Sequence, residues 1–242
     1  MKDTALSLLT ERGPLGAIEW LSRQNDPPAI ASTYSEVLVH QYWVAHDLAS
    51  VIQIGLAGIQ FCLNLAHKYS VDIAGQADGR RLTSPSLAES LKGTAKGLSY
   101  NLGSFCWPGW DEPGILIDAT ALAIGRDAAG LNLRLALELD KGDAPLSRAH
   151  WLIGAHELAA GNLEAARNSF DEGARCAALG NVIESQLLCN GFSLLAQQLQ
   201  NPQNPELEAE LNGSRERLRK TANGPGLVGQ IDTAQRIFAK TS

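Results

Sequence analysis

Histidine, cysteine and carboxylate side chains are the groups in this chain that could bind a metal ion or transfer a proton. Two pairs of histidines, His40 with His46 and His150 with His156, are each six residues apart. On a helix this spacing turns the two side chains about 120° away from each other. Neither pair has the i, i+4 spacing with which two histidines share a zinc ion. We therefore expect no metal site, and we interpret these histidines as residues at helix ends or beside a groove.

The sequence also lacks the motifs of nucleophilic and phosphoryl-transfer catalysis. It contains neither a Gly-x-Ser-x-Gly elbow nor a glycine-rich phosphate loop followed by Lys-Ser or Lys-Thr. The adjacent carboxylates Asp111 and Glu112 follow Trp110, and we interpret them as helix-capping groups. We therefore expect no catalytic residue and no cofactor.

The composition is typical of a folded globular protein, and the cysteines suggest that the protein is cytoplasmic. Of the 242 residues 45% are apolar and 19% are charged, and the net charge is −6. An acidic chain without a basic block is not expected to bind nucleic acid or an anionic membrane. The longest apolar run, 48–65, contains polar residues and two glycines, so we expect no membrane span. We interpret all four cysteines as buried, reduced thiols, and they are Cys62, Cys106, Cys176 and Cys189.

Hydrophobic periodicity predicts about eleven helices and no β-strand. The helical patterns are joined mostly by short segments that contain glycine, proline or asparagine. We expect a single all-α domain over residues 1–242. Within it we predict N-terminal helices in residues 1–28, helical hairpins over 33–222 and a C-terminal helix over 226–240.

Capping residues suggest where several of these helices begin. Thr33 and Glu36 form a possible capping box at the start of a helix. Asp111 is expected to begin another helix, and Asn181 a later one. The polar, glycine-containing segment 70–83 is predicted to be a loop.

The best-defined pattern is the segment 150–174, HWLIGAHELAAGNLEAARNSFDEGA. Two helical stretches are separated by a short junction at Gly161. Small residues recur where two helices must approach closely, and one large aromatic residue follows on the same face. These residues are Gly154, Ala166 and Gly173, with Phe170 as the aromatic one. The pattern predicts an antiparallel helical hairpin in which Phe170 fills the space towards the next hairpin.

This segment resembles a tetratricopeptide repeat, whose pattern is an apolar residue and Gly in helix A, Gly at the turn, and Ala-x3-Phe then a small residue in helix B. Ile153-Gly154 and Gly161 match that order and spacing, as do the helix B residues named above. His150 and Glu157 depart from it, because Trp and Tyr are usual at those positions. The resemblance implies an irregular, right-handed α-solenoid of stacked antiparallel hairpins. An ordinary orthogonal helical bundle is the alternative.

Weaker matches to the same pattern lie before and after this segment. Asn190-Gly191 aligns with Ile153-Gly154 at a distance of 37 residues, near the ~34-residue period of the family. Leu102-Gly103 aligns with it too, but at a distance of 51 residues.

The resemblance also implies a binding surface, because helix A of each hairpin lines the concave side of such a solenoid. The residues this places together are Tyr100, Asn101, Ser104 and Trp107 from one hairpin and Trp151, Ala155 and Leu158 from another. This lining is aromatic with an amide, and it has no cluster of Lys or Arg to bind a carboxylate. We therefore expect the partner to be an apolar or amphipathic segment of another protein.

Two questions stay open at this point. The segment Trp107-Pro108-Gly109-Trp110 is either a packed helix junction or a ligand anchor. A protein-interaction scaffold without catalysis is the leading hypothesis for function. The alternatives are a small-molecule sensor or enzyme with a pocket inside the helical array, using His150, Glu157 and Tyr100, and a structural subunit that oligomerises through its terminal helices.

Overall fold

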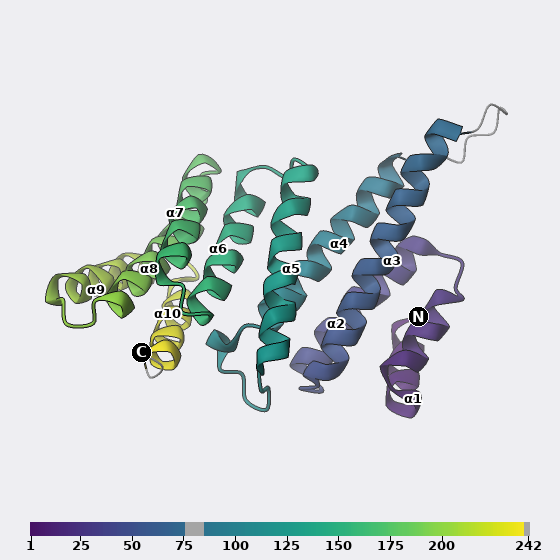
Figure 1. Ribbon diagram of the computed structural model, residues 1–242, viewed down its shortest axis with the longest axis horizontal. Coiled ribbons are helices and arrows are strands. Elements are labelled where there is room, and N and C mark those ends of the chain that lie inside the picture. Colours follow the sequence, from purple (N-terminus) through teal and green to yellow (C-terminus); the bar gives the residue numbers. More distant parts are fainter. Residues whose placement is uncertain (76–84, 240–242) are drawn as a thin grey trace. The chain divides into compact units, whose positions relative to one another are not determined.

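A computed structural model describes residues 1–75 and 85–239, and all regular structure in these two ranges is helical (Figure 1). Ten α-helices and one short 3₁₀ helix follow each other, and most of the packing is between helices adjacent in sequence. The all-α prediction is thus confirmed for the described residues. The helices are α1 Lys2–Ser22, α2 Pro27–Trp43, α3 Leu48–Gly75, α4 Pro85–Phe105, η1 Pro108–Trp110, α5 Ala119–Glu138, α6 Asp143–Ala159, α7 Leu163–Leu179, α8 Ile183–Gln200, α9 Pro205–Arg219 and α10 Gly224–Phe238.

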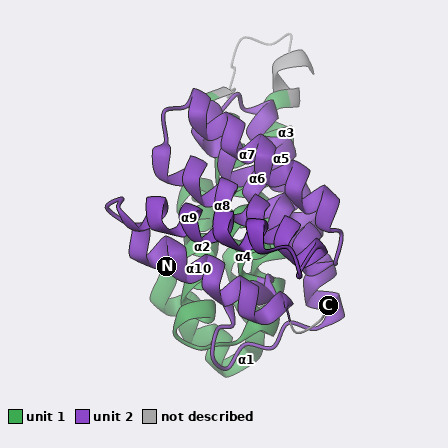
Figure 2. Ribbon diagram, turned by 90° about the vertical axis from the view of Figure 1, so that its left-hand side faces the viewer, with its two compact units in different colours: residues 1–105 green, residues 106–242 purple. Residues whose placement is uncertain are grey.

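The helices form two compact units (Figure 2). Unit 1 is Met1–Phe105 and contains α1 to α4, and unit 2 is Cys106–Ser242 and contains η1 and α5 to α10. Each unit has its own buried apolar residues, so each is described by itself.

In unit 1, α3 packs against both α2 and α4 at two glycines. A Cβ on Gly58 would lie 2.8 Å from Tyr34 Cβ of α2 and 3.0 Å from Leu98 of α4. One turn earlier, Gly55 lies in the same way beside Leu38 and Leu102, at 2.9 and 3.3 Å. Residue numbers rise along α3 as they fall along both neighbours, so α3 is antiparallel to α2 and to α4.

In unit 2, α6 and α7 form the antiparallel hairpin that the sequence predicts over 150–174. A Cβ on Gly154 of α6 would lie 2.7 Å from the ring of Phe170 on α7, and one on Gly173 would lie 3.5 Å from His150 Cβ. Phe170 is fully buried and its ring centroid lies 5.2 Å from that of Phe192 on α8. The predicted role of Phe170, between its own hairpin and the next helix, is therefore confirmed.

Two pairs of alternate helices in unit 2 run parallel, α6 with α8 and α8 with α10. Trp151 of α6 and Phe192 of α8 have ring centroids 5.4 Å apart, and the Ser147 and Cys189 side chains of the same helices are 4.0 Å apart. Side-chain contacts also join α8 to α10, at Glu184 with Asn223 (2.8 Å) and at Gln198 with Gln235 (3.4 Å). The partners in these four pairs are 37 to 42 residues apart in the sequence.

The N-terminal helices agree with the prediction, whereas the start of the next helix does not. Gly13, with φ 72° and ψ −179°, is not helical and divides α1 into two helical stretches, as the predicted N-terminal helices in residues 1–28 require. The capping box at Thr33 is wrong, because α2 already begins at Pro27 after Asp26, whose carboxylate accepts the Ala29 N–H at 3.1 Å. Thr33 lies inside α2, and its hydroxyl donates to the Ala29 carbonyl at 2.7 Å.

Asp111 does not begin a helix, contrary to the prediction. It ends η1 with a left-handed φ of 50°, and its carboxylate pairs with Arg236 of α10 at 2.7 Å. Asp118 caps α5 instead, accepting the Ala121 N–H at 2.7 Å. The intervening Pro113-Gly114 pair, with a positive φ at Gly114, separates the two carboxylates.

Two further boundaries are corrected. Asn181 is not the cap of α8, since it has φ 54° and α8 begins two residues later at Ile183. The predicted loop 70–83 is helical as far as Gly75, where α3 ends, and the rest of that segment lies outside the described residues. The C-terminal helix α10 begins at Gly224, two residues before the predicted start at 226.

One segment among the described residues is long and apolar enough to cross a membrane. It is Leu48–Ser70 within α3, with a mean hydropathy of 1.6. One face of this segment is buried in the core of unit 1 through Val51, Ile54, Cys62 and Ala66. A core helix of this kind has the same length and composition as a span, so the segment is weak evidence for a membrane. The expectation that the chain binds no membrane stays a prediction.

The packing of unit 2 predicts how much stability is lost when the Phe170 ring is removed. Phe170→Ala empties a fully buried site between α6, α7 and α8 and should lower the free energy of unfolding by about 3–5 kcal/mol in urea melts. Leu179→Ala, at a side chain 58% exposed near the end of the same helix, is the control and should change it by less than about 0.5 kcal/mol. A loss below about 1 kcal/mol for Phe170→Ala would contradict this packing role.

Candidate functional site

Unit 1 contains a groove between α2 and α4 with a volume of about 410 Å³. Most of the residues that line it are small or carry a hydroxyl, and they include Ser32 and Ser35 of α2 and Gly93, Thr94, Gly97 and Asn101 of α4. Helical periodicity explains the lining, because Gly93, Gly97 and Asn101 recur every four residues and so share one face of α4.

Two of the residues that line the groove are glycines with open space beside them. A Cβ added to Gly93 or Gly97 would meet no atom within 4 Å. The hydroxyls beside them are satisfied within their own helices, since Ser35 donates to the Ala31 carbonyl at 3.4 Å and Thr94 to the Ser90 carbonyl at 3.2 Å. The walls therefore present small groups to which another helix can approach closely, as helices do at small residues.

Asn101 supplies a polar group of this groove that is free to bond a partner. Its side chain is half-buried and makes no hydrogen bond within the part of the chain that the structure describes. Asn101 is one of the binding residues predicted from the sequence, and of that set it is the residue that lines the groove. An amide offers both a donor and an acceptor to a partner.

Exposed apolar side chains continue the groove face along α2. Val39 and Trp43 follow Ser35 at steps of four residues, and they are 36% and 55% exposed. Trp43 lies edge-on to Phe105 of α4 at 6.0 Å, where Tyr42 stacks on the same ring at 3.9 Å. Sequence reasoning missed Trp43, although its i+4 relation to Val39 was a usable signal.

The other predicted residues of α4 lie near Asn101 but have other surroundings. Tyr100 and Ser104 are half-buried, and each already interacts with another group of the protein. Neither of them lines the groove between α2 and α4.

The four remaining predicted binding residues belong to the core of unit 2. Trp107, Trp151, Ala155 and Leu158 are all at most 5% exposed. The indole N–H of Trp107 donates to the Ala155 carbonyl at 2.8 Å. Trp107 also packs edge-on against Trp151 at 5.5 Å. All four residues are buried and do not line an open surface within unit 2, so we place the candidate site in unit 1.

The Trp-Pro-Gly-Trp segment is therefore a packed junction rather than an exposed anchor. The Trp107 ring has four aromatic neighbours with centroids 4.9 to 6.1 Å away, which are Trp110, Trp151, Phe192 and Phe238. Gly109 is required in this turn, because a Cβ there would lie 2.3 Å from the Trp107 ring.

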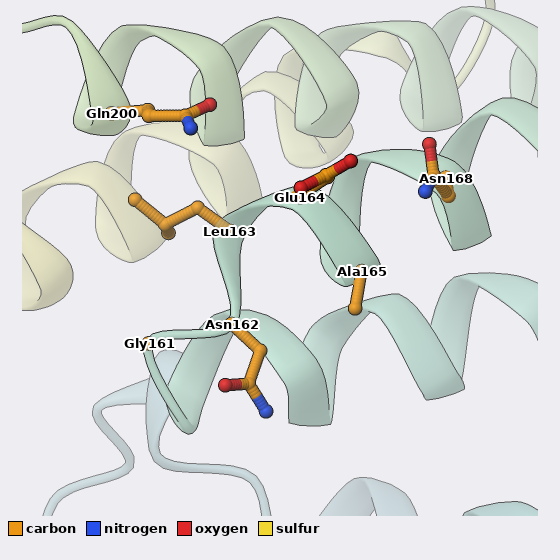
Figure 3. A pocket seen from close by; sticks show the side chains of 7 residues that line it. All are labelled: Gly161, Asn162, Leu163, Glu164, Ala165, Asn168 and Gln200. Atoms are coloured by element: carbon orange, nitrogen blue, oxygen red, sulfur yellow. The ribbon is translucent and has the colours of Figure 1, made fainter.

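A second hollow, of about 550 Å³, lies at the α6–α7 turn (Figure 3). Its polar groups are Asn162, Glu164 and Asn168 near the start of α7, with Gln200 at the end of α8. The Asn162 side chain already has a hydrogen-bond partner, since its amide donates to Glu157 at 2.7 Å. The hollow offers a single carboxylate and three amides, which is not the donor set of a nucleophile with its base.

The alternative pocket built on His150, Glu157 and Tyr100 is not assembled within either unit. Tyr100 belongs to unit 1, and the other two residues belong to α6 of unit 2. Glu157 pairs with Arg126 at 2.7 Å, whereas His150 lies beside Glu172 of α7. These two α6 side chains therefore face different partners.

His150 instead joins a cluster that sequence reasoning missed. Donor atoms of His150, Glu172 and Cys176 all lie within 4.8 Å of one another. Burial lowers the pKa of His150 and raises that of Cys176, while the hydrogen bond from Arg175 lowers the pKa of Glu172. The usable signal for two members of this cluster was the i, i+4 spacing of Glu172 and Cys176.

No protein-family model matches this chain, and no curated protein is significantly similar to it.

The different burial of Trp107 and Asn101 predicts opposite outcomes for their removal. Trp107→Ala should lower the free energy of unfolding by about 3–5 kcal/mol, because it empties an aromatic core. Asn101→Ala removes a side chain without a hydrogen-bond partner and should change stability by less than about 0.5 kcal/mol. Urea melts of both variants provide the measurement, and an unchanged stability for Trp107→Ala would show that Trp107 is not a core residue.

Proposed function

We propose that this protein is a non-enzymatic interaction scaffold that binds an amphipathic helical segment of another protein in the groove between α2 and α4. One observation supports the proposal above all. The groove is open and lined by two glycines, and the amide of Asn101 and the exposed indole of Trp43 lie on the same face.

We also infer that the helices form an irregular, tetratricopeptide-like, right-handed α-solenoid. The antiparallel pair α6–α7 and the parallel pairs α6/α8 and α8/α10 support this inference, as does the recurrence of contacts at 37 to 42 residues. That interval is somewhat longer than the ~34-residue period of the family. In unit 1, α2 and α4 are likewise alternate helices that contact each other, with α3 packed against both. They correspond to the A helices, which line the concave side in that family.

The shape of the groove favours a helical partner. Gly93 and Gly97 leave the α4 backbone uncovered, so a second helix can approach it with its own small residues. Helix-in-groove binding uses anchors at i, i+3, i+4 and i+7 of an amphipathic helix.

The side chains along the groove suggest how such a helix is oriented. Its apolar residues would cover Val39 and Trp43, because a half-exposed indole is a favourable anchor for binding. A polar side chain at the edge of its apolar face would bond the Asn101 amide, since a buried amide without a partner costs free energy. An acidic peptide terminus is disfavoured, because no Lys or Arg lines the groove.

The proposal predicts which variants lose binding. A display library of amphipathic helical peptides is selected on the full chain, and affinities of the selected peptides are measured by calorimetry. Gly97→Leu places a large side chain in the groove and should weaken binding at least about tenfold. Trp43→Ala removes the anchor and should weaken it by a similar factor. Asn101→Ala should weaken it about three- to tenfold, the value of one neutral hydrogen bond.

Matched variants in unit 2 serve as controls. Gly130→Leu places the same side chain at another helical glycine with open space around it, and Leu137→Ala truncates another exposed apolar side chain, 60% exposed. Both should bind the selected peptides as the wild type does. Peptides whose affinity is unaffected by all three groove variants would contradict the proposal.

A further inference from the structure

The α6–α7 hairpin brings three different metal-binding side chains to one place. His150 comes from α6, and Glu172 and Cys176 come from α7. Their donor atoms lie within 4.8 Å of one another, and the Cys176 sulfur is 3.9 Å from Glu172 Oε1. No other group of three such residues is this close among the side chains that the structure describes, in residues 1–70 and 86–239.

The packing of the hairpin explains this convergence. Glu172 and Cys176 are four residues apart, so they lie one above the other on the same face of α7. Between them in sequence, Gly173 lies where a Cβ would be 3.5 Å from His150 Cβ and 3.2 Å from the Ser147 carbonyl. The missing side chain at Gly173 lets α6 approach closely enough for His150 to reach the two α7 donors.

We propose that His150, Glu172 and Cys176 bind a zinc-type divalent ion that joins α6 to α7. Imidazole nitrogen, carboxylate oxygen and thiolate sulfur are the three protein donors that zinc uses, with a fourth tetrahedral position left to water. Tetrahedral bonds of zinc length place neighbouring donors about 3.5 Å apart. A contraction of well under 2 Å, within the reach of rotamer adjustment, would therefore bring this cluster to ligand spacing.

The exposure of the donors allows an ion to enter from one side. Cys176 is 2% exposed and forms the buried side of the cluster. A metal binds the imidazole in its neutral form and the sulfur as thiolate, so the Cys176 proton passes to solvent as the sulfur–metal bond forms. His150 and Glu172 are half-buried, which leaves the cluster open to an ion from solvent.

Arg175 is the group that opposes metal binding. Its guanidinium bonds both carboxylate oxygens of Glu172, at 2.8 and 2.5 Å. A bound cation would have to replace it at one oxygen at least, while Arg175, an exposed side chain, turns to solvent. Arg175 therefore sets the affinity of the site without being a ligand.

Cobalt(II) titration of the full chain, reduced and stripped of metal by a chelator, tests the proposal. Binding at Cys176 should produce a thiolate-to-cobalt charge-transfer band in the near ultraviolet, and added Zn²⁺ should abolish it. Cys176→Ala should abolish the band, and His150→Gln should weaken cobalt binding at least about tenfold. Arg175→Gln should instead tighten binding several-fold, because it removes the competing cation.

Cys62→Ala is the matched control, since Cys62 is a buried helical cysteine of unit 1 and should be irrelevant to the band. Thermal melts of each variant establish that it is folded. The absence of a charge-transfer band in the wild type, its persistence in Cys176→Ala or its loss in folded Cys62→Ala would overturn the proposal. Unchanged affinity in His150→Gln would overturn it as well. All these outcomes are independent of the groove in unit 1.

Discussion

Close approach of helices at glycine residues is the constraint on which both units depend. Where Gly55 and Gly58 face α2 and α4, and where Gly154 faces Phe170, a Cβ would fall within 3 Å of a buried neighbour. A helix packed at this distance buries side chains from both partners, and removal of apolar surface from water is the main favourable term in folding. In the absence of a sheet among the described residues, these contacts set the spacing of adjacent helices.

The glycines that face nothing are equally informative. Gly93 and Gly97 have the same residue type and the same helical setting as the packed glycines, but no atom lies within 4 Å of the position of their Cβ. A helix-interior glycine is costly compared with alanine. Two of them along an open groove, next to an unpaired amide and an exposed tryptophan, are what a surface for a further helix would require. We base the proposed scaffold function on these features of the groove.

The sequence predicted the pairing of helices in the best-defined hairpin far better than the surroundings of single residues. The hairpin at 150–174 and the buried role of Phe170 could be predicted because small and large residues alternate there at helical spacing. The predicted helix starts at Thr33, Asp111 and Asn181 were wrong because a stronger cap or turn lies nearby. For α2 this cap is Asp26, which is followed by Pro27 at the first helical position.

The candidate site was only partly predictable for a related reason. Asn101 was selected from its place in a predicted A helix, and it does line a groove. Trp107 and Trp151 were selected by the same reasoning and are core residues, because periodicity does not show which face of a helix is covered by the next one. The i, i+4 spacing of Glu172 and Cys176 indicates two members of the proposed metal site, but the addition of His150 depends on the register between α6 and α7, which the sequence does not reveal.

Substitution of the two kinds of glycine by alanine tests this account most directly. Gly154→Ala places a methyl group 2.7 Å from the fully buried Phe170 ring, so it should destabilise the protein by about 1–3 kcal/mol. Gly97→Ala places the same methyl group in open space on a helix and should stabilise it by about 0.5–1 kcal/mol. Urea melts that give effects of opposite sign agree with the account, and a stabilising Gly154→Ala or a clearly destabilising Gly97→Ala would contradict it.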